Sequence, residues 1–317
     1  MAFEHTSAMP EEVARHLACA PGMTAVDGTV GGAGHAAAIC RRISPGGIFI
    51  GVDRDIDAIK HAKNVLEAFQ DVTVHLVHDT FANLKTILHR LGLTRVDRIL
   101  LDLGVSLHQL KAGARGFSFT ADEPLDMRMD VRQPLTAADL VNDSSQETLA
   151  DILWRYGEER HSRRIARQIV ESRSREPITT AAVLADIVSR AAPRPRQQQR
   201  LHPATRTFMA LRIAVNEELI QLEGFMDSVP DVLQAGGRLC VLSFHSLEDR
   251  IVKHAMKTLA RACVCPPELP RCTCGGRAQF RLLTRRTERP SDAEIHSNPA
   301  ARSTRLRAIE RLSDTEG

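Results

Sequence analysis

A glycine-rich segment and two acids indicate where this chain does its chemistry. Residues 27–35 read DGTVGGAGH, and Asp53 and Asp102 each follow a separate run of apolar residues. Glycines after a strand let the backbone turn into a helix and approach a ligand closely. An acid at the end of the next strand can accept hydrogen bonds from both hydroxyls of a ribose. We therefore expect an adenosine-containing ligand beside Asp53.

The glycine pattern narrows the type of ligand. The segment is not a P-loop, because no Gly-Lys-Ser/Thr follows it, and it is not a clean GxGxxG motif either. A dinucleotide would favour the pyrophosphate-binding GxGxxG pattern. Acids at the strand ends suit the cationic sulfonium and amino groups of S-adenosylmethionine better. The alternative without a ligand is that the glycines only permit tight packing of a strand on a helix.

The elements that position these residues alternate between strand and helix. Strands are predicted at 24–27, 47–53, 72–78 and 96–104, and helices between them at 33–43, 55–69 and 82–91. Such alternation predicts right-handed βαβ units and a parallel sheet. The strand pattern returns at 236–244, and further strands are predicted at 280–286 and 303–310. A helix starts at Ser246, where the sequence SLED resembles a capping box.

The middle of the chain has a different pattern. Residues 105–135 indicate an ordered loop, and helices alone are predicted at 137–141, 146–156, 159–174 and 180–192. A linker-like turn at 192–199 then precedes a long predicted helix at 204–224. We expect an α/β domain whose two parts are residues 1–110 and 201–317. Residues 111–200 are expected to form an inserted helical domain that recognises the substrate.

The charge distribution supports a polyanionic partner. The formal net charge is only +3, but residues 151–212 hold 13 basic and 6 acidic side chains, a net charge of +7. Of the 42 basic residues 36 are arginine, whose guanidinium suits bidentate contacts with phosphate. Solvated helix faces are the alternative reading of these charges. One Trp and one Tyr argue against an aromatic platform for single-stranded nucleic acid.

The composition also excludes several classes of protein. With 43% hydrophobic residues the chain can bury a sizeable core, so it is neither disordered nor a small disulfide scaffold. No apolar run approaches the ~18–20 residues that a membrane span needs, so we expect no membrane partner. The start of the chain shows no basic secretory signal. Seven cysteines without such a signal indicate reduced thiols, and we expect a cytoplasmic protein.

Several long motifs resemble a known family. They include PLDMRMD at 124–130, YGEER at 156–160, HPATRTF at 202–208, SFHSLEDRIVK at 243–253 and the glycine-rich DGTVGGAGH. Further matches are ILLDLGVS at 99–106, RGFSF at 115–119, ALRIAVNEEL at 210–219 and NPAARSTRLRAIE at 298–310. Together they span nearly the whole chain. The chain therefore resembles the ribosomal small-subunit RNA methyltransferase H family, also called MraW.

The resemblance implies a fold, a reaction and a cofactor. The implied fold is a class I S-adenosylmethionine-dependent methyltransferase, a Rossmann-like α/β sheet with an inserted all-helical domain. The implied reaction is methylation of the exocyclic N4 of a cytosine in the decoding region of 16S rRNA, within the 30S subunit. S-adenosylmethionine is the implied methyl donor. Residue-by-residue transfer of the family's motif gives a cofactor site of Ala33, Gly34, His35, Asp53, Phe81, Asp102 and Gln109.

This chain departs from the family pattern at a few positions. Ala33 stands where the family usually has glycine, so a methyl group narrows the loop. Leu107 and His108 are atypical in the segment before Gln109.

The expected chemistry needs a hydrogen-bond acceptor for the target amine. The lone pair of cytosine N4 is delocalised into the ring, and an acceptor aimed at its N–H groups would localise that pair and then help to remove a proton. Asp102 is the first candidate, although it could instead contact the cofactor, and the backbone carbonyls of 103–105 are rivals. Ser243 and His245 are weaker candidates, and His245 could equally fix the loop.

Other residues are candidate substrate contacts. The target base must be unpaired or flipped to reach a buried site. Arg115, Phe117 and Phe119 with the PLDMRMD loop could cover such a base. The apolar groups would be packed, and Arg115 and Arg128 would be available for phosphate. The HPATRTF motif adds His202 and Arg206.

A second group of cysteines and arginines lies near the end of the chain. The pairs Cys263/Cys265 and Cys272/Cys274 are each separated by one residue, which is short for zinc chelation, so we expect no metal and prefer a reduced loop. The nearby arginines 271, 277, 281, 285 and 286 could contact RNA.

Two other functions remain open at this point. Methylation of a small-molecule or protein amine would be indifferent to salt, whereas RNA binding weakens steeply as salt rises. A non-catalytic ribosome-assembly protein would keep its cellular function when Asp53 is replaced by alanine. The oligomeric state is not fixed by the sequence.

Overall fold

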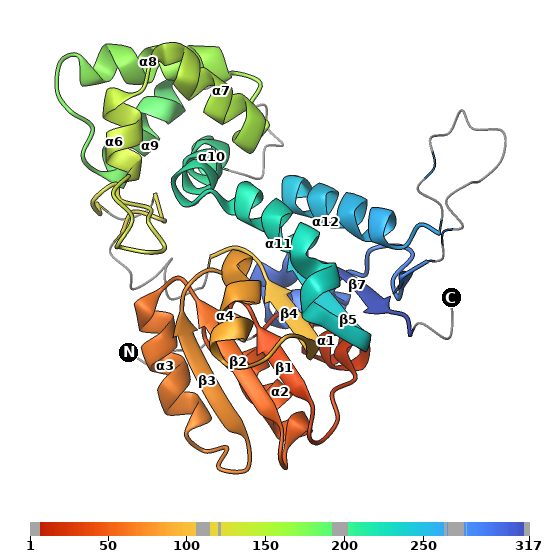
Figure 1. Ribbon diagram of the computed structural model, residues 1–317. Helices are drawn as coiled ribbons and strands as arrows, with labels where there is room; N and C mark the ends of the chain where they lie inside the picture. Colours follow the sequence, from red (N-terminus) through yellow and green to blue (C-terminus); the bar gives the residue numbers. More distant parts are fainter. Residues whose placement is uncertain are drawn as a thin grey trace. The chain divides into compact units, whose positions relative to one another are not determined.

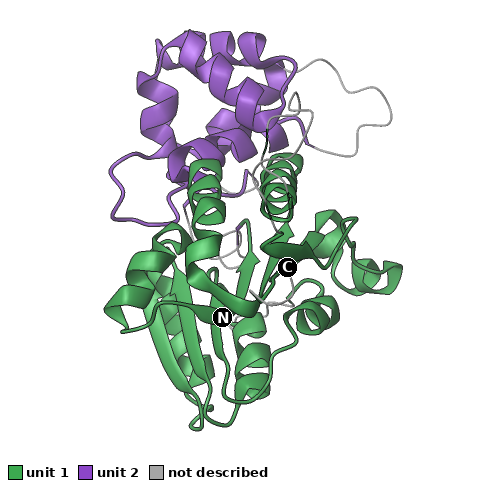
Figure 2. Ribbon diagram, turned by 45° about the vertical axis from the view of Figure 1, so that its right-hand side comes forward, with its two compact units in different colours: residues 1–104, 219–317 green, residues 105–218 purple. Residues whose placement is uncertain are grey.

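The computed structural model describes residues 7–105, 115–119, 122–191, 202–262, 265, 276 and 278–313. The chain divides into two compact units, coloured separately in Figure 2. The first unit contains residues 1–104 and 219–317, and the second contains residues 105–218. The second unit therefore includes a helix at 205–216, which the sequence analysis assigned to the end of the α/β domain.

The first unit is built on a seven-stranded sheet with the strand order β3-β2-β1-β4-β5-β7-β6 (Figure 1). Strands β1 to β5 are parallel, and β7 runs antiparallel to both β5 and β6. The strands are β1 (Thr24–Asp27), β2 (Ile48–Asp53), β3 (Thr73–His78), β4 (Val96–Asp102), β5 (Leu233–Ser243), β6 (Phe280–Leu282) and β7 (Arg305–Arg311). The predicted parallel α/β sheet is confirmed.

Two hydrophobic cores cover the two faces of this sheet. Alternate residues of β4 belong to different cores, since Ile99 and Leu101 join one and Leu100 joins the other. Helices α4 (Leu84–Arg90), α11 (Glu218–Val232) and α12 (Ser246–Leu259) contribute to the first core. Helices α1 (Pro10–Leu17), α2 (Gly34–Ile43) and α3 (Ile56–Leu66) contribute to the second. The sheet is thus buried on both sides, as parallel sheets require.

Short helices complete the first unit. They are the 3-10 helices η1 (Phe81–Asn83) and η2 (Pro299–Ser303) and the helix α13 (Asp292–Ser297). Helix α1 had no counterpart in the sequence analysis. Its eight residues bury only Val13 and Leu17, too few to give a periodic apolar pattern. No helix among the described residues is long and apolar enough to cross a membrane.

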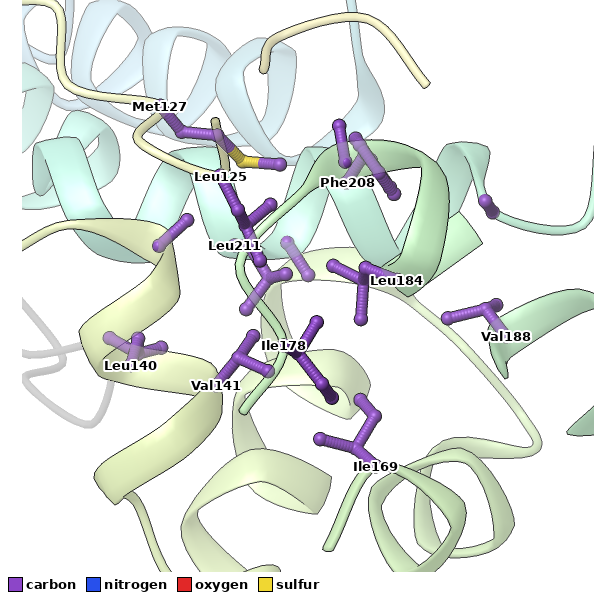
Figure 3. Close-up of a cluster of buried hydrophobic side chains, with 14 of the residues drawn as sticks. Leu125, Met127, Leu140, Val141, Ile169, Ile178, Leu184, Val188, Phe208 and Leu211 are labelled. Atoms are coloured by element: carbon purple, nitrogen blue, oxygen red, sulfur yellow. The ribbon is translucent and has the colours of Figure 1, made fainter. Parts of the chain in front are cut away.

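The second unit is helical around its own core. Its described part contains α6 (Ala137–Asp143), α7 (Gln146–Gly157), α8 (Ser162–Arg173), α9 (Ala181–Ala191) and α10 (Thr205–Asn216). Their apolar faces meet in one cluster, shown in Figure 3, to which the loop before α6 adds Leu125 and Met127. The inserted helical segment predicted from the sequence is confirmed in this form.

The single long helix predicted at 204–224 is wrong. The chain forms two helices, α10 and α11, which meet at Glu217, a residue with φ of 51° in the left-handed region. Asn216 is fully buried just before this break, and its side-chain amide donates to the Met127 carbonyl at 2.7 Å. The same side chain accepts the N–H of Met129 at 2.8 Å. The amide of Asn216 therefore ties the end of α10 to the loop before α6.

Candidate functional site

The carboxyl ends of β1, β2 and β4 form the candidate site in the first unit. Strand β1 lies between β2 and β4, so the strand order reverses at β1, and a crevice for ligands is expected at such a point. Each of these three strands ends in an aspartate, namely Asp27, Asp53 and Asp102. The sheet thus brings three acids from distant parts of the sequence to one edge.

Close packing fixes the glycine-rich loop after β1. The N–H of Gly28 continues the ladder to the Leu100 carbonyl at 2.9 Å. A Cβ atom on Gly28 would lie 2.4 Å from the Cδ2 atom of Leu101 and 3.0 Å from the Cβ atom of Phe81, so this position has no room for a side chain. The loop therefore runs directly against β4.

Ala33 ends the loop in an unusual conformation. Its φ is +60°, in the left-handed region, and its side chain is fully buried. A non-glycine residue in that region is strained by about 1–2 kcal/mol. This explains why glycine suits the position, and it shows that the extra methyl group is accommodated inside the core. Helix α2 begins at the next residue, Gly34.

Asp53 links the loop to β2. One of its carboxylate oxygens accepts the N–H of Gly31 at 2.9 Å, and the other accepts the N–H of Asp55 at 2.8 Å. Burial raises the pKa of Asp53 to about 6, although these N–H groups act in the opposite direction. Each carboxylate oxygen has two lone pairs, so the group can still accept hydrogen bonds from a ligand.

Asp102 has a buried oxygen to which no described residue bonds. Its backbone N–H donates to Thr29 Oγ1 at 2.6 Å, and its Oδ2 lies 3.8 Å from the Nε2 atom of His35. Its Oδ1 is buried and accepts no hydrogen bond from the described residues. Burial raises the pKa of Asp102 to about 8, and the charges of Asp27 and Glu248 add to the rise.

Asp27 is the third acid at this edge of the sheet. Its side chain is almost fully buried, and Oδ1 accepts the N–H of Thr29 at 3.1 Å. Burial raises the pKa of Asp27 to about 7, with a contribution from the charge of Asp53. Neighbouring carboxyl groups that disfavour one another's ionisation are stabilised by a cation placed among them. The edge is therefore suited to a ligand that carries positive charge.

Phe81 lies in the core. Only 8% of it is exposed, and its ring meets that of Phe225 edge-to-face, with centroids 5.7 Å apart. Thr80 caps the 3-10 helix that contains Phe81 and donates its hydroxyl to Gln221 at 2.5 Å. The ring thus holds the segment after β3 beside Gly28. Gln109, Leu107 and His108 lie outside the described residues.

Ser243 and His245 follow β5 and both have structural partners. The Ser243 hydroxyl donates to the Arg305 carbonyl at 3.3 Å. His245, not Ser246, is the capping residue of α12, so the predicted capping box at Ser246 is displaced by one residue. The carboxylate of Glu248 accepts the N–H of His245, and the Glu248 N–H donates back to the imidazole Nδ1. His245 therefore fixes the loop.

Two candidate substrate contacts of the second unit, Arg115 and Arg128, bond to groups of their own loop. Arg128 binds Asp126 through Nε and Nη2 at 2.8 Å each, while its Nη1 donates to backbone carbonyls. Arg115 donates to the carbonyls of Arg128 and Met129 and lies 5.6 Å from the centre of the Phe117 ring. These contacts hold the loop before α6 together.

His202 and Arg206 lie at the start of α10 and are exposed. The imidazole of His202 stacks on the ring of Phe119 with centroids 4.5 Å apart. Arg206 donates to the Glu158 carbonyl at 3.2 Å, which joins α10 to the end of α7. The structure thus brings His202 together with Phe119, whereas Arg206 contacts α7.

The cysteine-rich segment is mostly outside the described residues. Cys263, Cys272 and Cys274 are not described, nor are Arg271 and Arg277, whereas Cys265 is described and half-buried. No group of three or more His, Cys, Asp or Glu side chains that could hold a metal occurs in the described part of the chain. Arg281 pairs with Glu310 at 2.9 Å.

Sequence reasoning missed Thr29 and Glu248. Thr29 lies inside the quoted glycine-rich segment, but nothing in its spacing indicates that it bonds to a residue 73 positions away. Glu248 could have been found, because His245 and Glu248 have the three-residue spacing of a capping box.

Comparison with known proteins gives matches along the whole chain. A family model described as the MraW methylase family matches residues 2–312. A protein of Desulforapulum autotrophicum called "Ribosomal RNA small subunit methyltransferase H" is 51% identical over 313 residues, which cover 98% of this chain and 100% of the relative. A protein of the same name from Geobacter sulfurreducens is 50% identical over 312 residues, again with 98% and 100% covered.

Solved structures give more distant matches. TrmN from Thermus thermophilus aligns with a TM-score of 0.43 and 12% identity, covering 96% of this chain and 48% of that chain. A putative rRNA methylase from Clostridium thermocellum aligns with a TM-score of 0.42 and 13% identity, covering 97% and 99%.

Proposed function

The chain belongs to the MraW methylase family, and on this premise we propose that it methylates the exocyclic N4 of a cytosine in the decoding region of 16S rRNA. It is an rRNA methyltransferase that uses S-adenosylmethionine as methyl donor. The observation that carries the proposal is 51% identity to a ribosomal RNA small subunit methyltransferase H along 98% of the chain. The natural substrate is the 30S subunit or a late precursor, and the reaction takes place in the cytoplasm.

The residues of the first unit fit the donor. S-adenosylmethionine supplies a methyl group attached to a positively charged sulfur. The loop approaches closely at Gly28, and the buried Oδ1 of Asp102 has no partner among the described residues; a bound ligand would use both features. Asp53 is proposed to accept hydrogen bonds from the ribose, while Ala33, Gly34 and His35 line the start of α2. Phe81 and Gln109 are also proposed to contact the donor.

Asp102 is proposed to handle the proton of the amine. Transfer of the methyl group forms an N–C bond and breaks the S–C bond of the donor, and the nitrogen must lose one proton to become neutral again. The ionised carboxylate of Asp102 can accept one N–H of the amine and then that proton. A base is most effective when its pKa lies near the working pH, and the pKa of Asp102 is raised to about 8. The backbone bond from Asp102 to Thr29 holds the carboxylate in place during this step.

Contacts with RNA are proposed for both units. In the second unit, Phe117 is packed in the core and Arg115 orders the loop beside it, while His202 and Arg206 are exposed and available to RNA. Arg128 is proposed to act indirectly, since its side chain bonds to Asp126 and to backbone carbonyls of its own loop. In the first unit, Ser243 and His245 are proposed to shape the site after β5.

A methylation assay on ribosomal particles tests the proposal. Purified protein is incubated with labelled S-adenosylmethionine and 30S subunits that lack the modification, and the modified nucleoside is identified by mass spectrometry. N4-methylcytidine in the decoding region is the expected product. If the protein binds the donor but leaves these subunits unmethylated, the substrate assignment fails. A label on a different base or a different atom also contradicts the proposal.

A further inference from the structure

The described arginines of the second unit differ in whether they bond to a carboxylate or carbonyl of the chain. Six of them face a carboxylate within 4 Å: Arg128, Arg132, Arg155, Arg167, Arg190 and Arg212. Three more, Arg115, Arg173 and Arg206, donate to backbone carbonyls. Among the described residues of this unit, the arginines without such a contact are Arg160, Arg163, Arg164 and Arg175. Three of these four lie within five consecutive positions.

Those three arginines gather at one end of the α7–α8 pair. Helices α7 and α8 pack against each other, and their labels stand next to each other in Figure 1. Residues 158–161 join the last turn of α7 to the first turn of α8, so the two turns lie at the same end. Helix α8 buries Ile165, Ala166 and Ile169, and this leaves Arg163 and Arg164 on its exposed side.

The last turn of α7 adds an exposed aromatic ring at this end. Trp154 is the only tryptophan of the chain, and 58% of it is exposed. Its neighbour Leu153 is fully buried, so the helix directs the two side chains to different sides. Trp154, in the last turn of α7, and the three arginines, around the first turn of α8, are thus all exposed at the same end of the helix pair, where a ring and positive charges are available to a partner.

Nearby acids do not cancel the positive charge. Glu159 is buried, and its carboxylate accepts the N–H of His161 at 2.8 Å. Glu171 faces Arg167 at 3.6 Å. Residues 158–175 contain six arginines and three glutamates, so their net charge of +3 equals that of the whole chain. This end of the helix pair therefore keeps a positive net charge.

The chemistry of this end matches RNA. Guanidinium groups bind phosphate oxygens in pairs, and an indole ring stacks on any unpaired base. One ring is not a stacking platform for a run of bases, but it is sufficient for one. We propose that the end of the α7–α8 pair formed by Trp154, Arg160, Arg163 and Arg164 binds the RNA backbone and stacks one unpaired base. The inference deepens the proposed function and rests on its RNA substrate.

The test compares two sets of charge-removing variants. The first replaces Arg160, Arg163 and Arg164 with glutamine. The control replaces Arg132, Arg155 and Arg190 with glutamine, which removes the same charge from exposed arginines that already face a carboxylate. Exposed pairs of this kind contribute little to stability, so both sets should fold. Thermal melting and S-adenosylmethionine affinity, measured first, should equal those of the wild type.

Binding of a decoding-region fragment of 16S rRNA is then measured between 50 and 300 mM salt, concentrations that span the regime in which phosphate contacts dominate. Loss of three phosphate contacts should lower the slope of log affinity against log salt by about 2. It should also weaken binding at least tenfold near 100 mM salt, whereas the control should change binding less than threefold. Equal slopes for the first set and the wild type would overturn the proposal.

Trp154 provides an independent readout. Because the chain has no other tryptophan, quenching of the intrinsic fluorescence on RNA addition reports on this ring alone. Trp154→Leu should weaken RNA binding about tenfold, as expected for one stacked base. Fluorescence unchanged at saturating RNA contradicts the stacking. With 30S subunits, the first set should raise KM and keep kcat; absence of methylation by the wild-type protein counts against the proposed function instead.

Discussion

Replacing Thr29 with valine removes the hydroxyl that joins the ends of β1 and β4 while keeping the shape of the side chain. In the structure the hydroxyl oxygen accepts the N–H of Asp102 at 2.6 Å, and the same hydroxyl acts to lower the pKa of the buried Asp27 carboxyl. The ladder between the two strands ends at Gly28, so this side chain takes the place of the next backbone carbonyl.

The size of the effect follows from the lost acceptor. A buried N–H without a partner costs about 1–2 kcal/mol when, as here, the bond is part-buried. The bond also holds the carboxylate that is proposed to accept the proton, so we expect its loss to raise the activation free energy by a similar amount and to slow methyl transfer by Thr29→Val about 5- to 30-fold. The pKa of Asp27 should rise further above about 7, because the Thr29 hydroxyl lowers it in the wild type.

Single-turnover methyl transfer to 30S subunits at several pH values measures both effects, with donor affinity and thermal melting recorded in parallel. The control is Thr29→Ser, which keeps the hydroxyl and should recover most of the rate. Wild-type rates in the valine variant would refute the reasoning. A serine variant as slow as the valine variant would assign the effect to the methyl group instead.

Four further outcomes are expected. Affinity for the cationic donor should rise between pH 6 and 8.5, because Asp102, with a pKa of about 8, ionises in this range; calorimetry should show the dependence weakened in Asp102→Asn. Thermal stability without donor should fall as the pH rises over the same range, because the buried Asp102 carboxyl holds its proton in the folded state and must lose it as the pH approaches 8. A stability that rises with pH would contradict this effect of burial. Gly28→Ala should destabilise by about 1–3 kcal/mol in urea unfolding, because its Cβ meets Leu101, whereas Gly224→Ala, with open space around it, should be neutral or stabilising. His245→Ala should lose about 1 kcal/mol with the cap of α12, and His245→Asn should keep most of it; equal losses would exclude capping as the cause.

The regular part of the fold was predictable because its signals are local. The strand at 24–27 was predicted with its observed bounds, and the strands ending at Asp53 and His78 differ from the prediction by one residue at their start. Apolar runs bounded by turn residues carry this information. The strand predicted at 280–286 is shorter in the structure, where β6 ends at Leu282. Of the three residues of β6 only Phe280 is buried.

The non-local parts were not predictable from one sequence. The break at Glu217 depends on the buried amide of Asn216, whose partners in the loop before α6 lie 87 and 89 positions away. Nothing in the helical periodicity around 204–224 indicates this contact. The convergence of Asp27, Asp53 and Asp102 followed from the rule that parallel strands end at one edge, but the unpartnered oxygen of Asp102 needed atomic positions.

The first unit is assembled from two separate segments of chain, and this affects how the protein folds during synthesis. Strand β4 ends at Asp102, but its partner β5 begins only at Leu233, so the centre of the sheet stays incomplete until the whole second unit has emerged. The second unit is one continuous segment with its own core, so it can fold first on the translating ribosome. During that interval β4 presents an open, apolar edge of the kind that pairs with other chains. The nascent chain is therefore most prone to aggregate between the synthesis of β4 and that of β5.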